Sequence, residues 1–180
     1  MRKVTIAAYD KQWPAMFEDE SLLLKRTLGH VIAQIHHVGS TSVPGLAAKP
    51  TIDILLEVVS LNALDTLNAA MARAGYRARG ENGIPNRRYF TKGGEQRSHQ
   101  VHAFATGDRQ IVRHLAFRDY LIGNQEAAER YTEVKRSAAR ASENDMHRYS
   151  TFKAGFIEYH LQLALADWAR RASLPRENQD

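Results

Sequence analysis

The sequence of 180 residues contains no cysteine. Disulfide bonds, thiolate metal ligands and a cysteine nucleophile are therefore excluded. The absence of cysteine is compatible with a location in a reducing compartment. Long apolar runs are also missing. The apolar stretch near the N-terminus breaks at Tyr9 and Asp10, too early for a secretory signal, and no later stretch has the length of a membrane span. We therefore expect a soluble, cytoplasmic protein with no membrane partner.

Charge of one sign is only mildly in excess. The chain has 25 Lys and Arg residues against 20 Asp and Glu, a formal net charge of +5, and these residues are spread over several segments. This balance favours an anionic partner such as a nucleotide or another phosphorylated small molecule. A nucleic acid is compatible with the charge but ranks last, because the basic residues do not cluster in a stripe with interleaved aromatic residues. The oligomeric state is not determined by these features.

The hydrophobic pattern predicts a single α+β domain over residues 1–180, with residues 172–180 as a frayed polar tail. The predicted helices are 10–28 capped by Asp10, 60–74 between Ser60 and Gly75, 108–122, 125–141 and 150–172. The predicted strands are 31–38, 51–59, and a hairpin of 87–92 and 97–105 around Gly93 and Gly94. We therefore expect a small mixed sheet with flanking helices, and a helical C-terminal part that packs against the site.

The loop between the first two predicted strands concentrates small residues and hydroxyls. Gly39 allows close backbone approach and unusual dihedral angles. Ser40, Thr41 and Ser42 offer hydroxyls and successive N–H groups that could hold phosphate oxygens. The alternative is an ordinary Gly/Ser/Pro turn, which this string favours when it is taken alone.

Asp53 interrupts the apolar strand 51–59. An ionised carboxylate there is costly unless it is paired or binds a cation, so we favour a functional role over an ion pair with Lys49 or an arginine. Strand alternation places Leu55 and Glu57 on the same side as Asp53. A solvated strand end explains Glu57 more simply than a functional role.

Histidines form a second group of candidate side chains. In the hairpin, His102 shares a face with Gln100 and Phe104, whereas His99 lies on the other face. An imidazole at His102 beside Asp53 would suit Mn²⁺ or Zn²⁺ better than Mg²⁺, which prefers oxygen ligands. A hydrogen-bonded or exposed sheet residue is the alternative; we prefer it for His99, and both interpretations stay open for His102.

The string HVGSTSVPGLAAKPTIDI resembles the signature of the GrpB family, which is related to the nucleotidyltransferase superfamily. The likeness continues along most of the chain, in YDKQWPAMFEDE, RRYF, HQVHAF, LAFRDYL and YSTFKAGFI. It implies a nucleotidyltransferase-like fold, in which a Gly-Ser pair holds the triphosphate and carboxylates on the following strand bind divalent cations that assist attack on the α-phosphate. Gly39 and Ser40 match that pair, and Asp53 matches the second of the two usual acids. Thr51 stands where the first acid would be.

The resemblance also defines a set of candidate site residues. It raises Lys49, Arg88, Arg118 and Lys153 above ordinary surface charges. The predicted catalytic residues are Asp53, Ser40 and Lys49. The predicted ligand-binding residues are Gly39, Ser40, Thr41, Lys49, Arg88, Arg118 and Lys153. The predicted metal ligands are Asp53 and His102, for Mg²⁺, Mn²⁺ or Zn²⁺.

Two functions follow from this set. The leading hypothesis is a site that binds a nucleotide or related phosphorylated molecule with a divalent metal, with possible transfer of a nucleotidyl group to an unidentified acceptor. The alternative keeps the fold but not the chemistry, as a ligand-binding or regulatory module. Thr51 favours the alternative, because a two-metal site lacks one bridging carboxylate.

Overall fold

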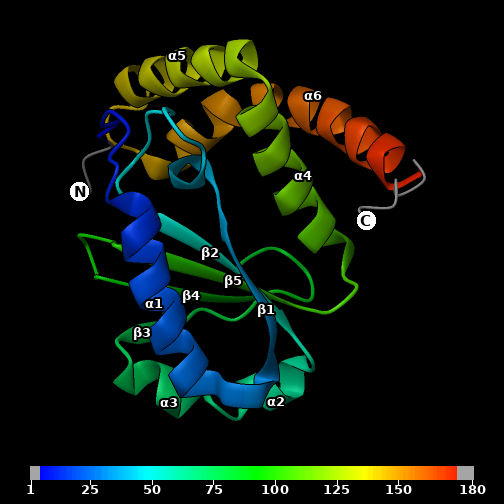
Figure 1. Ribbon diagram of the computed structural model, residues 1–180. Coiled ribbons are helices and arrows are strands. Elements are labelled where there is room, and N and C mark those ends of the chain that lie inside the picture. The colour runs from blue at the N-terminus through cyan, green and yellow to red at the C-terminus, as the bar shows by residue number, and fades with distance from the viewer. Residues whose placement is uncertain (1–4, 174–180) are drawn as a thin grey trace.

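Five strands form one mixed sheet within residues 5–173, the part of the chain that the structure, a computed structural model, describes. Their order across the sheet is β1 (Ile32–Val38), β2 (Ile52–Val58), β5 (His99–Ala105), β4 (Arg88–Lys92) and β3 (Tyr76–Ala78). β2 and β5 are parallel, and the other neighbouring pairs are antiparallel. The predicted α+β class with a small mixed sheet is confirmed (Figure 1).

The largest part of the core lies between the sheet and α1 (Trp13–Leu28). One face of β2 contributes four fully buried side chains to it: Ile52, Ile54, Leu56 and Val58. On the other face Leu55 packs against Phe104. Burying each such side chain contributes roughly 1.5–3 kcal/mol to the stability of the folded state. β2 therefore stabilises the packing on both faces of the sheet. Asp53 and Glu57 lie on the Leu55 face, as the strand period predicts.

The start of α1 differs slightly from the prediction. The N-cap residue is Gln12 and not Asp10. The Asp10 carboxylate still receives the Gln12 N–H at 2.9 Å, so it stabilises the turn that enters the helix. Gly29, with φ +55°, ends α1 at the predicted place.

The predicted helix 60–74 is divided into two short helices, α2 (Leu61–Asp65) and α3 (Asn68–Arg73). At the break, the Thr66 hydroxyl donates to the Ala63 carbonyl at 2.7 Å. Such a local side-chain bond competes with the helical hydrogen bonds of the backbone. The continuous helix predicted from the apolar stripe was therefore wrong at its centre.

The two ends of this segment follow the prediction. The Ser60 hydroxyl accepts from the Ala63 N–H at 3.3 Å, and Gly75 has a φ of +89° that terminates α3. The edge strand β3 follows at once and was not predicted from the sequence. It has only three residues and pairs with β4 alone, so its sequence carries no alternation to detect.

Three helices form the C-terminal part of the described chain: α4 (Arg109–Gly123), α5 (Gln125–Ala141) and α6 (Met146–Ser173). α6 begins four residues before the predicted position 150, because Asp145 receives the N–H groups of His147 and Arg148 at 2.7 and 3.1 Å. The predicted tail 172–180 is helical to Ser173, and residues 174–180 lie outside the described part.

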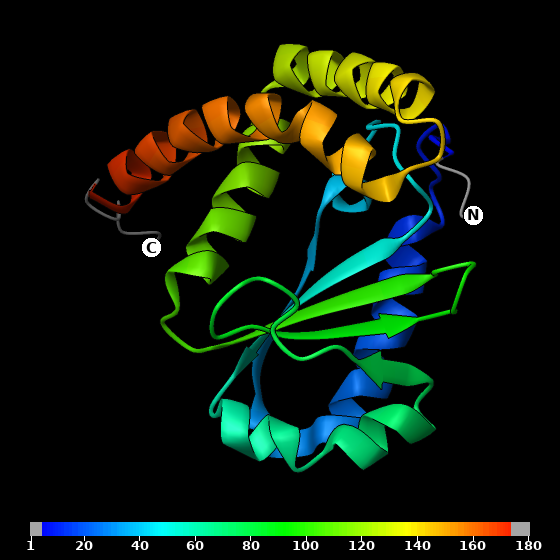
Figure 2. The ribbon, with the colours of Figure 1, turned by 180° about the vertical axis from the view of Figure 1, so that it is seen from behind.

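These three helices gather at one end of the molecule, and α2 and α3 lie at the opposite end (Figures 1 and 2). α4 reaches the sheet and packs against β1 and β2, while α6 packs on both α4 and α5. No helix within residues 5–173 combines the length and the apolar character that crossing a membrane requires.

Candidate functional site

A cavity of about 740 Å³ separates the sheet from the helical part. We call it the main cavity. Its walls come from the turn after β1, the first residues of β2, the β4–β5 pair, α5 and α6. The charged or titratable residues that line it are Lys49, Asp53, Arg87, Tyr89, Arg97, His102, His114, Lys135, His147, Tyr149 and Lys153.

Gly39 and Asp53 meet where β1 ends and β2 begins, because the strand register pairs Val38 with Asp53. Gly39 has φ +71° and ψ −171°, a backbone conformation that is essentially restricted to glycine. A Cβ atom at this position would lie 2.5 Å from Asp53 Oδ2. The turn backbone therefore rests directly against the carboxylate, which only a glycine permits.

The three hydroxyls of the following turn differ in availability. Thr41 is buried, and its hydroxyl contacts the Thr51 carbonyl at 3.4 Å and His37 Nε2 at 3.0 Å. The Ser42 hydroxyl donates to the Gly39 carbonyl at 2.6 Å. Ser40 is half-buried and lines the main cavity. Of the three, Ser40 has the hydroxyl best placed for a ligand. The Thr41 hydroxyl instead makes contacts within the protein that hold the turn in place.

His102 lies between Arg87 and Asp53. Its Nδ1 is 3.3 Å from Arg87 Nη1, and its Nε2 is 3.7 Å from Asp53 Oδ1. A guanidinium can only donate, so Nδ1 accepts, and a neutral His102 carries its proton on Nε2, facing the carboxylate. A metal on Nε2 would need that proton to move to Nδ1, against the Arg87 donor. Asp53 is thus the readier metal donor of the predicted pair.

Lysines surround Tyr149 on the helical side of the main cavity. The Nζ atoms of Lys49 and Lys153 lie 5.1 and 4.8 Å from the centre of the Tyr149 ring. Burial lowers the pKa of Lys153, an effect that the Asp53 carboxylate opposes. Burial, with the neighbouring charges of Lys153 and Arg136, lowers the pKa of Lys135 to about 7. An anion in the main cavity would relieve this crowding of buried cations.

Two predicted ligand-binding arginines lie outside the main cavity. Arg88 forms a two-pronged ion pair with Asp65, at 2.7 and 2.8 Å, and its neighbour Arg87 lines the cavity instead. Arg118 donates to Asp119 and to the His37 carbonyl, and lines a smaller pocket on the other side of Ser40.

The other candidate side chains take structural positions. Glu57 does not line the main cavity, but the predicted solvated strand end was wrong: its side chain is 14% exposed and pairs with His36 at 2.8 Å. His37 stacks on Phe17, with ring centroids 4.8 Å apart, and faces α1. His99 is buried 3.7 Å from Glu20.

Several lining residues were not selected from the sequence. Lys135 follows Tyr131 by four residues, so it lies on the apolar stripe of α5. A lysine within an apolar stripe could have been recognised from the sequence as a candidate site residue. Tyr149 precedes Lys153 by four residues and shares its face of α6. Arg97 and His114 carried no local signal, because only the packing of distant elements brings them to the cavity.

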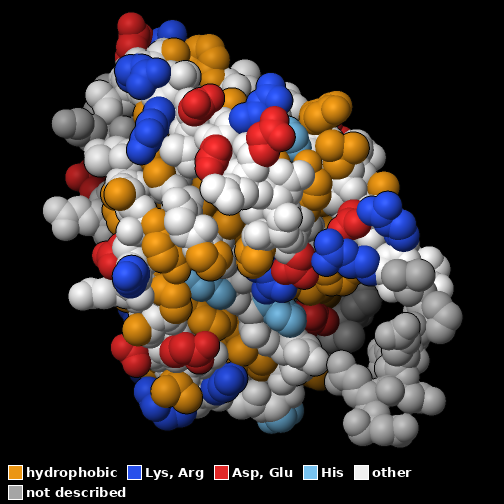
Figure 3. Space-filling model, turned by 45° about the horizontal axis from the view of Figure 1, so that its top comes forward, with side chains coloured by type: hydrophobic (Ala, Val, Ile, Leu, Met, Phe, Trp, Pro, Cys, Tyr) orange, Lys and Arg blue, Asp and Glu red, His pale blue; other side chains and the backbone are white. Residues whose placement is uncertain are grey.

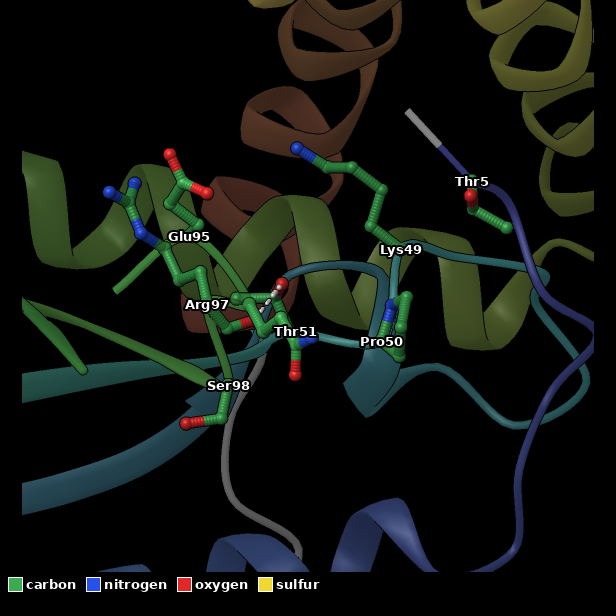
Figure 4. A pocket seen from close by; sticks show the side chains of 8 residues that line it. Thr5, Lys49, Pro50, Thr51, Glu95, Arg97 and Ser98 are labelled. Atoms are coloured by element: carbon green, nitrogen blue, oxygen red, sulfur yellow. Dashed lines mark hydrogen bonds between the residues drawn. The ribbon is translucent and has the colours of Figure 1, made fainter. Parts of the chain in front are cut away.

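The position of the missing acid is occupied by a structural side chain. Thr51 is 3% exposed, and its hydroxyl donates to the Arg97 carbonyl at 3.0 Å. Beyond it a hollow of about 450 Å³ extends toward the β4–β5 turn and shares Lys49, Thr51 and Arg97 with the main cavity (Figure 4). Glu95 lines that hollow only. Asp53 is the one carboxylate among the described lining residues, and residues 5–173 contain no group of three or more His, Asp or Glu side chains suited to a metal.

The two adjacent arginines allow a matched test of the cavity. Arg87→Ala removes a lining cation and the partner of His102, and should weaken binding of an anionic ligand about tenfold. Arg88→Ala breaks a partly exposed ion pair and should leave ligand affinity unchanged, with a loss of stability below about 1 kcal/mol. Isothermal titration, with urea unfolding in parallel, measures both; equal effects on affinity would contradict the assignment of Arg87 to the cavity.

Two half-buried histidines predict how stability depends on pH. Burial lowers the pKa values of His37 and His114 from 6.5 to about 4. Between these values the unfolded chain binds more protons than the folded chain, so stability is complete above pH 6.5 and falls as pH decreases toward 4. His37→Phe should flatten this fall by about 1–2 kcal/mol in urea unfolding at about pH 7 and about pH 4.5. An undiminished fall would show that His37 titrates normally.

The mixed sheet followed by helices, with a glycine-serine turn against a strand carboxylate, is a nucleotidyltransferase-like fold. The Cid1 poly(U) polymerase with Mg 3′-dATP bound shares this fold, with a TM-score of 0.54 and 17% identity over 75% of this chain and 44% of that one. The family described as GrpB protein matches residues 3–163. The chain belongs to the GrpB family.

Two relatives illustrate this membership. The crystal structure of the conserved protein GrpB from Enterococcus faecalis has a TM-score of 0.87 and 38% identity, covering 91% of this chain and 99% of that one. The UPF0157 protein YqkA of Bacillus subtilis is 43% identical over 157 residues, which are 87% of this chain and 46% of YqkA. The chain therefore spans about half the length of that relative.

Proposed function

We propose that the main cavity binds a nucleotide, or another phosphorylated small molecule, together with a divalent cation. The observation that carries this proposal is the charge of the lining: Lys49, Arg87, Arg97, Lys135 and Lys153 surround the single described carboxylate of Asp53. The volume of about 740 Å³ lies in the range of roughly 300–1,000 Å³ that small-molecule sites occupy. Such a site suits a ligand with several negative charges.

Asp53 is the residue that would hold the cation, and His102 would join it only if Arg87 released the imidazole. A bound cation would neutralise phosphate charge and polarise the phosphoryl group. With one or two protein donors, phosphate oxygens and water must complete the coordination, as is usual for Mg²⁺ in phosphate sites. The cation alone should therefore bind weakly, and the cation and the phosphates should strengthen each other.

A single carboxylate favours binding over catalysis. Two-metal phosphoryl transfer needs acids that bridge both cations, and Thr51 supplies a structural hydroxyl where the resemblance leads one to expect an acid. A ligand-binding or regulatory module is thus the better supported version of the proposal. If transfer does occur, Ser40 and Lys49 would hold the phosphates while Asp53 acts through its cation.

A small ligand is favoured over a nucleic acid. The basic groups converge inside the main cavity, whereas on the face seen in Figure 3 basic and acidic side chains are interspersed with apolar ones. A nucleic-acid site would instead present a continuous basic surface.

A thermal-shift panel tests the proposal, with ATP, GTP, CTP and UTP each combined with Mg²⁺, Mn²⁺ or Zn²⁺. A ligand at about 100 times its Kd adds roughly 2.7 kcal/mol, which is several degrees for a domain of this size. We expect the largest shift with nucleotide and metal together. No shift with any pair would overturn the nucleotide proposal.

Pyrophosphate release separates the two versions of the function. Incubating the nucleotide that binds with the metal and candidate acceptors should give no release if the protein is a binding module. Release that requires an acceptor and disappears in Asp53→Asn would instead establish nucleotidyl transfer, since release without an acceptor would be hydrolysis of the nucleotide.

A further inference from the structure

A second pocket, of about 240 Å³, lies on the other side of the Gly39–Ser40 turn. We call it the helical pocket, because α4, α5 and α6 supply most of its lining residues. Its lining residues outside the turn are Gln110, Arg113, His114, Phe117, Arg118, Leu121, Tyr131, Ile157 and Leu161. The pocket is smaller than the roughly 300–1,000 Å³ of a complete small-molecule site, and its size suits one ring system.

The helical pocket has the chemistry of a site for a planar ring. Its inner wall is apolar and aromatic, with Phe117 packed edge-on to the buried Tyr131 at a centroid distance of 5.9 Å. Polar side chains of Gln110, Arg113 and Arg118 complete the lining. Aromatic and guanidinium planes of this kind stack on nucleobases, and amides hydrogen-bond to their edges.

The helical pocket and the main cavity are adjacent. Gly39, Ser40, His114 and Ile157 line both spaces. The helical pocket is therefore next to the place where phosphates held by Ser40 and the lysines of the main cavity would lie.

His114 presents a hydrogen-bond acceptor at this junction. Its Nδ1 lies 2.7 Å from the Gln110 carbonyl, which can only accept, so Nδ1 carries the proton. In the neutral ring with this tautomer, Nε2 is an unprotonated acceptor, suited to an N–H group and unsuited to a phosphate oxygen.

We propose that the helical pocket binds the nucleobase of the nucleotide whose phosphates occupy the main cavity, and that His114 Nε2 accepts a hydrogen bond from an N–H group of that base. This inference rests on the proposed function. It adds that the ligand is a nucleotide and that the base determines specificity.

The test compares the four nucleoside triphosphates with inorganic tripolyphosphate, all with Mn²⁺, by isothermal titration. The pocket variants are Gln110→Trp, which fills the mouth from the half-exposed first turn of α4, and His114→Phe, which keeps the ring but removes the acceptor. The control is Ile122→Trp, which adds similar bulk to α4 at a side chain 51% exposed and outside the pocket.

We expect at least one nucleoside triphosphate to bind wild type about tenfold tighter than tripolyphosphate. Gln110→Trp, which lies outside the main cavity, should remove that advantage and leave tripolyphosphate affinity unchanged. His114→Phe should also remove the advantage, while Ile122→Trp should retain it. If tripolyphosphate binds as tightly as every nucleotide, the inference is wrong and the phosphate site stands. Equal loss of nucleotide and tripolyphosphate binding in Gln110→Trp would also overturn it. If nothing binds wild type, the proposed function and the inference both fail.

Discussion

Asp53→Asn should abolish metal-dependent ligand binding and leave the unliganded fold nearly unchanged. Asparagine keeps the shape of the side chain but is a poor ligand for a hard cation. The Asp53 side chain is 28% exposed on the cavity side of β2, so its removal should alter unliganded stability by no more than about 1 kcal/mol. The roughly 2.7 kcal/mol that a ligand adds at about 100 times its Kd should disappear.

Glu57→Gln is the matched control for this experiment. Glu57 lies on the same strand and the same face as Asp53, but pairs with His36 outside the main cavity. Thermal unfolding of both variants, with and without nucleotide and Mn²⁺, should show full ligand stabilisation in Glu57→Gln and none in Asp53→Asn. If Asp53→Asn lowers stability equally with and without metal, Asp53 is a structural partner of the surrounding cations and not a cation ligand.

Gly39→Ala should cost both stability and binding. Forcing alanine into the glycine-only backbone region costs about 1–3 kcal/mol. The new Cβ would also lie 3.0 Å from the Asp53 Cβ and 2.5 Å from Oδ2, so either the turn or the carboxylate must move. We expect a loss of about 2–4 °C in Tm per kcal/mol, together with a loss of ligand stabilisation.

Gly45→Ala separates backbone strain from this close contact. Gly45 also has a positive φ, of +79°, but an added Cβ would meet no atom within 4 Å. Gly45→Ala should therefore lose stability through strain while it retains ligand binding. Retained binding in Gly39→Ala would show that the turn and the carboxylate can separate without damage to the site.

The sequence predicts elements well where a local pattern repeats. The apolar stripe through Tyr131 placed α5 at 125–141, where it lies in the structure. The prediction failed where a single polar side chain decided the backbone path, as Thr66 does between α2 and α3 and Asp145 does before α6. These competing side-chain hydrogen bonds leave no periodic trace.

The part of the site at the junction of β1 and β2 could be predicted from the sequence. Gly39 and Ser40 directly follow β1 and Asp53 lies on β2, and the antiparallel pairing of Val38 with Asp53 brings them together. Strand alternation separated His102 from His99, the resemblance implied that His102 lies near Asp53, and its Nε2 is 3.7 Å from the carboxylate. Local periodicity determines such relations because it specifies the face on which a side chain lies.

Only the tertiary structure decided which charges surround Asp53. It placed Arg87 rather than Arg88 at the main cavity, turned Thr51 into a structural hydrogen-bond donor, and buried Lys135 beside Lys153. It also formed the helical pocket behind Ser40, from helices far along the chain. Periodicity specifies the face of a helix or strand on which a side chain lies, but not the residues that pack against that face. Those residues depend on how distant helices pack against the sheet and on which buried charges that packing can tolerate.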